Sequence, residues 1–289
     1  MKYDMVMIGH ISKDILIDHK GERYDLLGGA VVHSAFTAAA TGKKIKVYTK
    51  LAAEDEKLLD SLQHENIDWE CLSSKETTSI KNTYFTADKE RREVVLLSQA
   101  DPFTIDEITE SADVFYLAGL FGGEIPDSFI KPLSERGKVA MDAQGVLRCL
   151  DDSKDLVFKD WENKEELLPY LTYFKTDAAE AHILTGIEDR HKGLEQLHAW
   201  GAKEIMLTHN TEVLIRTQEG IVSSEYTNKS NVGRTGRGDT TFSSYIAWRM
   251  DHSALESIQF AAALCSIKME SPKVFDASLE EVFARMKQS

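Results

Sequence analysis

The residues best suited to chemistry in this chain lie in a glycine-rich stretch near its C-terminal end. Gly236 and Gly238 flank Arg237, and Asp239 follows at once. Glycines let a backbone approach a ligand closely, and apolar residues at helical spacing follow, so the stretch predicts a loop that leads into a helix. The unpaired N–H groups and the positive dipole end of that helix would bind an anion such as a phosphate.

Asp239 itself allows two interpretations. Asp is a common residue at a helix N-cap, and an isolated Gly-x-Gly-Asp is more often a cap than a catalytic site. A carboxylate beside a phosphate cradle can instead accept the proton of a hydroxyl group that attacks a phosphoryl group. The stretch alone leaves both interpretations open.

Composition limits the classes of function. The 289 residues suffice for one large domain or two small ones, and the net charge of −14 argues against nucleic-acid or anionic-membrane partners. No apolar run approaches the length of a membrane span, and Met5–Gly9 is too short for the core of a signal peptide. The three cysteines are far apart and in no ligand spacing, which favours reduced thiols in a cytoplasmic protein.

The order of predicted elements indicates the fold class. Strands are expected at 3–8, 45–52, 67–72, 114–118, 139–142, 172–175 and 204–208. Helices are expected at 30–41, 54–64, 126–136, 165–169, 177–184, 192–200, 240–250, 254–270 and 279–287. This alternation predicts an α/β protein with a mostly parallel, doubly wound sheet and helices on both faces. Without a linker or an internal repeat, we expect one domain over residues 1–289.

Two β-prone pairs interrupt the alternation. Residues 80–86 and 93–97 flank a polar turn at 87–92 and predict a hairpin that cannot join a parallel series, so it should stand off the main sheet. A second hairpin is expected from 213–216 and 221–226. Asp14, in a strand-like run at 11–18, is either a solvated residue on a half-exposed strand or a ligand-binding carboxylate.

These features, in this order, resemble the PfkB (ribokinase-type) carbohydrate kinase family over essentially the whole chain. The most specific match is 235–242, which follows the family's Thr-Gly-Ala-Gly-Asp-Thr-Phe signature with an Arg in place of Ala and an extra Thr before Phe. The resemblance implies a three-layer α/β/α fold with a small β-sheet lid from about 11–27 and 79–98. It also implies an anion hole at Gly236, Arg237 and Gly238, with Asp239 as the catalytic base.

The resemblance also implies which residues bind the acceptor substrate. Gly28 and Gly29 look like the family's sugar-binding signature, and Asp14 would then bind substrate hydroxyls. His33 stands where the family usually has a substrate-contacting Asn. The stretch with Gln144 and Arg148 looks like the Asp-x-Asn-x-x-Arg that some members carry beside the substrate, and it favours an inositol-kinase-like branch.

On the donor side, the resemblance implies a nucleotide pocket at Thr208 and Thr235. The family's Thr-x-Gly is Thr208-His209-Asn210 here, so the adenine side lacks its glycine. The family's Asn-x-x-Glu, which orders magnesium through water, appears as Asp177 and Glu180. Asp is also an oxygen ligand, although Asp-x-x-Glu on a helix is by itself usually a solvated face.

The implied activity is Mg²⁺-assisted transfer of the γ-phosphate of ATP to a hydroxyl of a small sugar or cyclitol. The polar residues predicted around the acceptor suit a compact, hydroxyl-rich molecule. A nucleoside or vitamin-precursor kinase on the same fold, and a non-catalytic sugar- or nucleotide-binding regulator, are the alternatives. Lid sheets in this family often pair between subunits, so a homodimer through the lid is a further expectation. The sequence leaves the acceptor and any requirement for a monovalent cation open.

Overall fold

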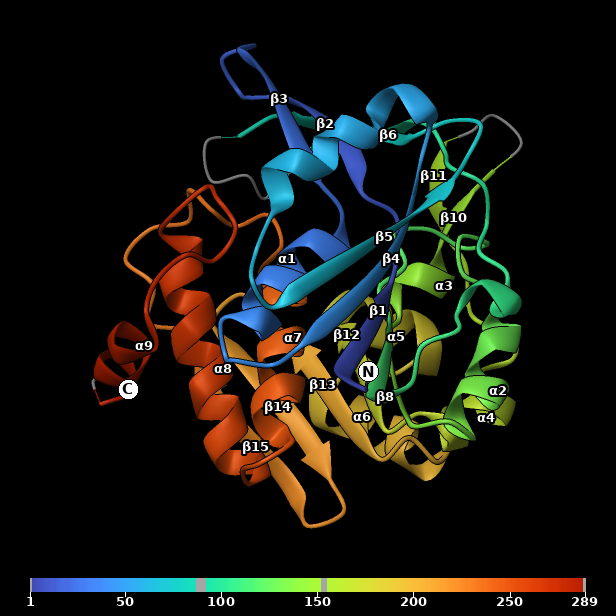
Figure 1. Ribbon diagram of the computed structural model, residues 1–289. Coiled ribbons are helices and arrows are strands. Elements are labelled where there is room, and N and C mark those ends of the chain that lie inside the picture. The colour runs from blue at the N-terminus through green and yellow to red at the C-terminus, as the bar shows by residue number, and fades with distance from the viewer. Residues whose placement is uncertain (1, 87–91, 152–154, 288–289) are drawn as a thin grey trace.

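The computed structural model describes residues 2–86, 92–151 and 155–287, and its centre is a large, mostly parallel β-sheet (Figure 1). Within these residues the strand order is β15-β14-β13-β12-β9-β8-β1-β4-β5. The bounds are β1 Tyr3–Ile8, β4 Ile45–Leu51, β5 Ile67–Ser73, β8 Ala112–Leu117, β9 Lys138–Asp142, β12 Tyr173–Asp177, β13 Glu204–Thr208, β14 Glu212–Thr217 and β15 Gly220–Glu225. The predicted second hairpin, β14–β15, extends the sheet as its antiparallel edge.

Helices cover both faces of this sheet, as the alternation predicted. Along β1, Met5 and Met7 belong to one buried cluster, and Val6 and Ile8 belong to the other. The first cluster includes residues of α1 (Ala30–Ala39), α7 (Arg237–Arg249) and α8 (Ala254–Met269), and the second includes residues of α2 (Ile130–Ser134), α5 (Ala178–Thr185) and α6 (Arg190–Ala199). Burial on both faces explains why the strands are continuous apolar runs. Helix α9 (Leu279–Met286) packs on α8.

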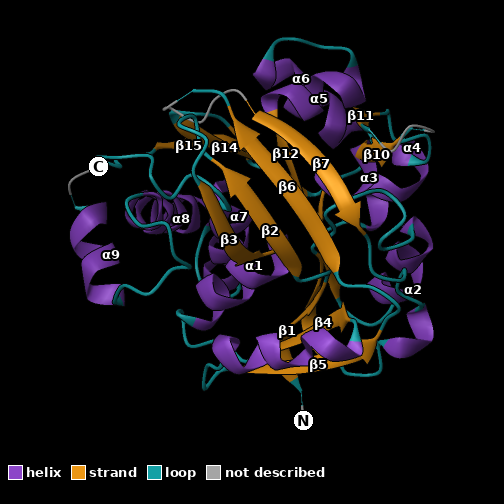
Figure 2. Cartoon of the chain, turned by 90° about the horizontal axis from the view of Figure 1, so that it is seen from above, coloured by secondary structure: helices purple, strands orange, loops and turns teal. Residues whose placement is uncertain are grey.

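A four-stranded sheet forms the lid, which Figure 2 shows in front of the larger sheet. Its strand order is β3-β2-β6-β7, with bounds β2 Ser12–Ile17, β3 Arg23–Gly28, β6 Thr78–Tyr84 and β7 Arg92–Ser98. Strands β2 and β6 pair in parallel, whereas the outer pairs are antiparallel. The predicted lid is therefore confirmed. Most of its predicted turn, at 87–91, lies outside the described residues.

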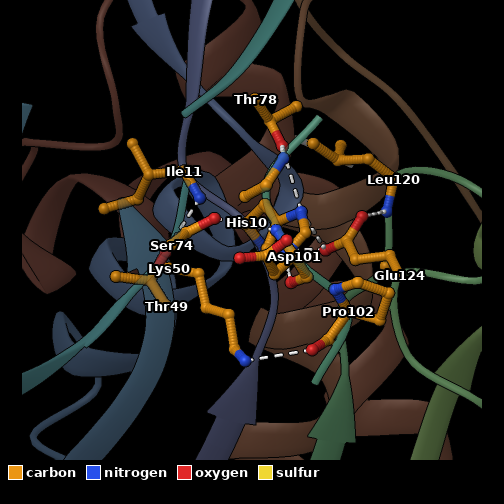
Figure 3. Close-up of polar contacts among 12 residues, drawn as sticks. His10, Ile11, Thr49, Lys50, Ser74, Thr78, Asp101, Pro102, Leu120 and Glu124 are labelled. Atoms are coloured by element: carbon orange, nitrogen blue, oxygen red, sulfur yellow. Dashed lines mark hydrogen bonds and ion pairs between the residues drawn. The ribbon is translucent and has the colours of Figure 1, made fainter. Parts of the chain in front are cut away.

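A buried polar network fixes the base of the lid, where the chain crosses from β1 to β2 (Figure 3). The fully buried carboxylate of Glu124 accepts hydrogen bonds from the backbone N–H of His10, at 2.7 Å, and of Leu120, at 2.8 Å. The His10 ring contacts the Thr78 hydroxyl at 3.0 Å and the Asp101 carbonyl at 3.2 Å. The network therefore joins the base of the lid to the large sheet.

Two segments away from the glycine-rich loop depart from the sequence expectations. The segment predicted as a helix at 54–64 is a 3-10 helix, Ala53–Leu62, in which only Leu62 is buried, so little packing favours a regular α-helix. In addition, β10 (Arg148–Leu150) and β11 (Leu156–Phe158) form a two-stranded sheet that was not predicted. This sheet lies in the sequence between two short helices, α3 (Gln144–Leu147) and α4 (Lys164–Leu167). Three-residue strands are too short for a periodicity signal. No helix of the described chain could cross a membrane.

Candidate active site

The glycine-rich loop places Asp239 inside a helix instead of at its cap. Helix α7 begins at Arg237, and its N-cap is Gly236, whose φ of 78° lies in the left-handed region that favours glycine. A Cβ on Gly236 would also lie 2.5 Å from atoms of the His33 ring. Asp239 is thus the third helical residue, and the N-cap interpretation of this carboxylate was wrong.

Gly238 allows a buried lysine to reach the first turn of α7. A Cβ at position 238 would lie 2.7 Å from Cε and 3.0 Å from Nζ of Lys175, which comes from β12. Lys175 Nζ donates to Asp142 Oδ2, from the end of β9, at 2.7 Å. Burial acts to lower the pKa of Lys175, but the nearby carboxylates of Asp142, Glu180 and Asp239 raise it, so the side chain is a permanent cation. The sequence analysis missed this residue.

The electrostatic environment of Asp239 suits a base. Burial raises the pKa of its carboxyl group to about 6, and Asp142 adds to the shift, while Lys175, Arg148 and Lys268 oppose it. Such a carboxylate is largely ionised at neutral pH and yet accepts a proton more readily than an exposed one. The backbone N–H of Arg237 donates to the carbonyl of Arg234 at 3.1 Å. Because this N–H already has an acceptor, the anion hole predicted at 236–238 cannot use it. The backbone amides of Gly238 and Asp239, in the first turn of the helix, are candidates for the anion hole.

Two adjoining cavities meet at Asp239. One of about 100 Å³ lies under the lid, and one of about 330 Å³ lies over the strand ends. Gln144, Arg148, Thr235, Gly236 and Asp239 line both. The arrangement gives two binding compartments with Asp239 at their junction.

The smaller cavity collects most of the predicted acceptor residues. Asp14, Gly29, His33, Gln144 and Arg148 line it, together with Ser12, Ala30, Ile80, Asn82, Val94, Leu120, Thr235, Gly236 and Asp239. Asp14 Oδ1 accepts a hydrogen bond from the Ser12 hydroxyl at 2.7 Å. Gly28 does not line the cavity but supports it, because a Cβ there would lie 2.4 Å from the Asp14 carboxylate.

His33 forms a neutral wall of the smaller cavity. Burial, and secondarily the charge of Lys268, lower the pKa of its imidazole to about 3. Its buried Nδ1 finds no hydrogen-bond partner among the described residues, and the ring packs against Gly236. His33 therefore supports the loop and contributes an uncharged surface to the cavity.

The larger cavity is lined by basic side chains that face three carboxylates. The cations are Arg148, Lys175, Arg234 and Arg237, and the carboxylates are Asp177, Glu180 and Asp239. Thr208, Thr235 and the loop glycines complete the wall with Gln144 and two aromatic residues, Tyr84 and Phe158. This lining suits a compact, highly charged anion.

Asn210 fixes two of these cations. Its Oδ1 accepts hydrogen bonds from Arg234 Nη2 and Arg237 Nη1, each at 3.2 Å. The Arg237 guanidinium also lies over the Tyr226 ring, 6.0 Å from its centroid. Asn210 is the residue that replaces the glycine of the predicted Thr-x-Gly, so the departure from the signature has a structural role. Arg234 was missed because it lies outside that signature.

Asp177 and Glu180 form a capping box at the start of α5. Asp177 Oδ1 accepts from the Glu180 N–H, and Glu180 Oε2 accepts from the Asp177 N–H, both at 2.8 Å. Burial raises the pKa of Glu180 to about 7. No group of three or more His, Cys, Asp or Glu side chains within the described ranges could hold a metal ion. The two carboxylates at the cavity wall therefore fit a magnesium ion only with water or phosphate as further ligands.

A separate recess of about 560 Å³ lies at the other end of the strands of the large sheet. Its lining includes Lys2, Lys138 and Lys203. These residues adjoin the amino ends of the strands, and the lining contains none of the predicted site residues. Ligands of open α/β sheets bind at the carboxyl ends of the strands. The candidate site is therefore the pair of cavities at Asp239.

Comparison with known proteins agrees with this geometry. The pfkB family carbohydrate kinase model matches residues 7–280. A cytidine kinase from Thermococcus kodakarensis is 27% identical over 211 residues, which cover 71% of this chain and 72% of that protein. The Arabidopsis thaliana ribokinase, solved with ribose and ATP, shares the fold with a TM-score of 0.77 at 17% identity, and the match covers 100% of both chains.

Two structures that are more similar to this chain show a kinase in the ribokinase family that is described as pyrophosphate-dependent. A sulfate complex has a TM-score of 0.90 and 35% identity, covering 97% of this chain and 99% of that one. A complex with a pyrophosphate analog and myo-inositol has a TM-score of 0.88 and 34% identity, with the same coverage. This chain therefore belongs to the PfkB family of carbohydrate kinases and is a sugar kinase with the ribokinase fold.

Proposed function

We propose that this protein transfers a phosphoryl group from inorganic pyrophosphate to one hydroxyl of a cyclitol such as myo-inositol. The observation that carries the proposal is the pair of guanidinium groups, Arg234 and Arg237, that Asn210 holds at the wall of the larger cavity. The relatives described as pyrophosphate-dependent, at 34–35% identity, support the same donor.

The donor argument rests on charge and space. Pyrophosphate carries its negative charge on a small volume, and unlike ATP it has no nucleobase that the protein must bind. The larger cavity offers four cations, whereas a purine would need an apolar slot beside the strand ends. Asn210 brings its side chain and two guanidiniums to the position where the family signature has a glycine. ATP, the donor predicted from the sequence, is the competing candidate.

The acceptor argument rests on the smaller cavity. Its volume of about 100 Å³ suits a six-membered polyol better than a nucleoside, which has both a ribose and a base to place. Asp14, Asn82 and Gln144 offer hydrogen-bonding groups, while Ile80 and Val94 can pack on the C–H face of a ring. A cavity that hydrogen-bonds hydroxyl groups rejects analogues that lack them.

The chemistry needs few parts. The acceptor oxygen attacks one phosphorus atom of the donor, the P–O–P bond breaks, and phosphate leaves while Asp239 takes the hydroxyl proton. Arg237, Lys175 and the helix amides stabilise the charge on the transferring group. A magnesium ion bound through water at Asp177 and Glu180 would neutralise donor charge. The lid excludes water, which would otherwise hydrolyse the donor.

A donor-by-acceptor panel tests the proposal. Pyrophosphate and ATP, each with Mg²⁺, are combined with myo-inositol, ribose, cytidine and adenosine, and acceptor-dependent product is measured. We expect the largest kcat/KM for pyrophosphate with myo-inositol. A preference for cytidine or adenosine over every polyol would support the nucleoside-kinase alternative, and no product from any pair would favour a regulator.

We also propose that the lid forms a homodimer. Strand β3 is an edge strand of the lid sheet, and it carries two exposed apolar side chains, Tyr24 (44% exposed) and Leu26 (48%). Exposed apolar residues on an unpaired edge favour pairing with another chain. Light scattering during gel filtration should give twice the monomer mass, and Leu26→Lys should give the monomer. A monomer mass for the unsubstituted protein would contradict the proposal.

A further inference from the structure

A buried lysine lies directly beneath the glycine-rich loop. Lys268, on α8, is only 2% exposed and is among the largest fully buried side chains of the described chain. Its Nζ donates a hydrogen bond to the carbonyl oxygen of Gly233 at 2.7 Å and another to that of Thr235. Both carbonyls belong to the segment that leads into Gly236.

The loop is folded closely onto the end of α8 around this ammonium group. The N–H of Gly233 donates to the Met269 carbonyl at 2.9 Å. A Cβ at position 233 would lie 1.7 Å from the carbonyl oxygen of Ser271, so only glycine fits there. The loop carbonyls therefore converge on the Lys268 charge because the backbone is held in place on both sides.

This arrangement has the chemistry of a cation site. Backbone carbonyl oxygens that converge on one positive charge are the ligands by which proteins bind monovalent metal ions. A buried ammonium group is costly unless several acceptors surround it, and here the loop supplies two of them. Lys268 thus places a covalently attached cation where loop carbonyls could otherwise bind a free one.

The position of Lys268 has a direct consequence for the active site. In a trans peptide the C=O and the following N–H point in opposite directions, so holding the Thr235 carbonyl toward α8 turns the Gly236 N–H away from α8. Gly236 lines both cavities. The charge of Lys268 also acts against the burial that raises the pKa of Asp239. The lysine therefore orients the loop and adds positive potential at the site.

We propose that Lys268 is a positioning residue that replaces a bound monovalent cation, so that phosphoryl transfer by this enzyme needs neither K⁺ nor Na⁺. The inference rests on the proposed phosphoryl transfer. It does not depend on which donor or acceptor the panel identifies, because the loop serves any phosphoryl donor.

The first test uses the unmodified protein. Turnover of the best donor–acceptor pair is measured at constant ionic strength in tetramethylammonium, sodium, potassium and ammonium chlorides, with Mg²⁺ fixed. We expect the rate to vary by less than about 2-fold among the four salts. Activation by K⁺ or ammonium of about 10-fold or more would overturn the proposal. Lack of turnover with every pair would instead refute the proposed function.

The second test removes the internal cation. Lys268→Met and Lys268→Ala are compared with Lys273→Met, an exposed lysine beyond the end of α8, in the same four salts. By analogy with the loss of one group that stabilises a transition state, kcat of the position-268 variants should fall by about 100-fold in tetramethylammonium. K⁺ or ammonium should restore at least 10-fold of this loss in the Ala variant, whose cavity can admit an ion.

Circular dichroism and melting temperatures separate this effect from a folding defect. Folded variants that keep parental kcat in tetramethylammonium would overturn the proposal, and so would a folded Lys268→Ala variant that loses activity but responds to no small cation. Where neither variant folds, the salt response of the unmodified protein decides. Lys273→Met should match the unmodified protein in every salt.

Discussion

Replacing Asp239 by Asn should move activity and stability in opposite directions. The substitution keeps the shape of the side chain but removes its charge and its ability to accept a proton. Loss of a general base lowers kcat by about two to four orders of magnitude. No cap is lost, because Gly236 is the N-cap of α7 and Asp239 is the third helical residue.

The stability effect follows from the pKa of Asp239. The folded pKa of about 6 lies above the value of 3.8 that an unperturbed Asp carboxyl has, and each tenfold change in the ionisation equilibrium corresponds to about 1.4 kcal/mol. The folded state disfavours the ionised carboxyl, so this group costs nothing below pH 4 and destabilises increasingly as the pH rises through 6. The full cost at pH 8 is about 3 kcal/mol at most, since Asp239 lines an open cavity and water reduces it.

The assay compares melting temperatures and kcat at pH 4.5 and pH 8. Asp239→Asn should raise the melting temperature by a few degrees at pH 8 and by only about a third as much at pH 4.5, where less of the cost has developed. In the unmodified protein, kcat/KM should rise with pH through about 6, as the carboxylate ionises. A variant that melts earlier at pH 8 and retains near-normal turnover would refute both the position of Asp239 and its role.

Three further predictions test other parts of the site and its support. Lys175→Met should destabilise the fold by about 3–5 kcal/mol, because it leaves the buried Asp142 carboxylate unpaired. The double variant Lys175→Met/Asp142→Asn should recover the denaturant midpoint of unfolding but not kcat. Full recovery of kcat would show that the Lys175–Asp142 pair has only a structural role. Arg237→Lys should lower kcat more than it raises the apparent KM of the donor, because Lys lacks the two-pronged geometry of Arg. Unchanged kinetics of Arg237→Ala would show that only its backbone matters. Glu124→Ala should cost about 2–6 kcal/mol of unfolding free energy in denaturant titrations, because two buried N–H groups lose their acceptor, and a loss below 1 kcal/mol would contradict this account of the lid base.

Much of the fold could be predicted because its signals are local. The strand at Tyr3–Ile8 has the predicted bounds, since a buried parallel strand is a continuous apolar run that ends at glycine. The lid hairpin stood out because its alternating pattern interrupts the strand–helix order. The glycine-rich loop before α7 could be predicted because glycine spacing before a helix is itself a local signal.

The missing parts of the site depend on contacts between distant segments. The start of α7 shifted to Arg237 because Gly236 packs against His33, about 200 positions earlier in the chain. Lys175 and Lys268 act through partners 33 to 35 residues away in the sequence. A lysine within an apolar strand or helix is a detectable anomaly, but its partner becomes visible only in the fold.

The most direct test of the central claim is a ³¹P NMR measurement of the purified protein with Mg²⁺, myo-inositol and either pyrophosphate or ATP. With pyrophosphate, a phosphomonoester signal and an inorganic phosphate signal should grow in equal amounts, and only when myo-inositol is present. With ATP in its place, the phosphomonoester should form at least about 10-fold more slowly, because the four cations that line the donor cavity suit a compact, highly charged anion. Faster transfer from ATP, or phosphate release from pyrophosphate without the phosphomonoester, would contradict the account.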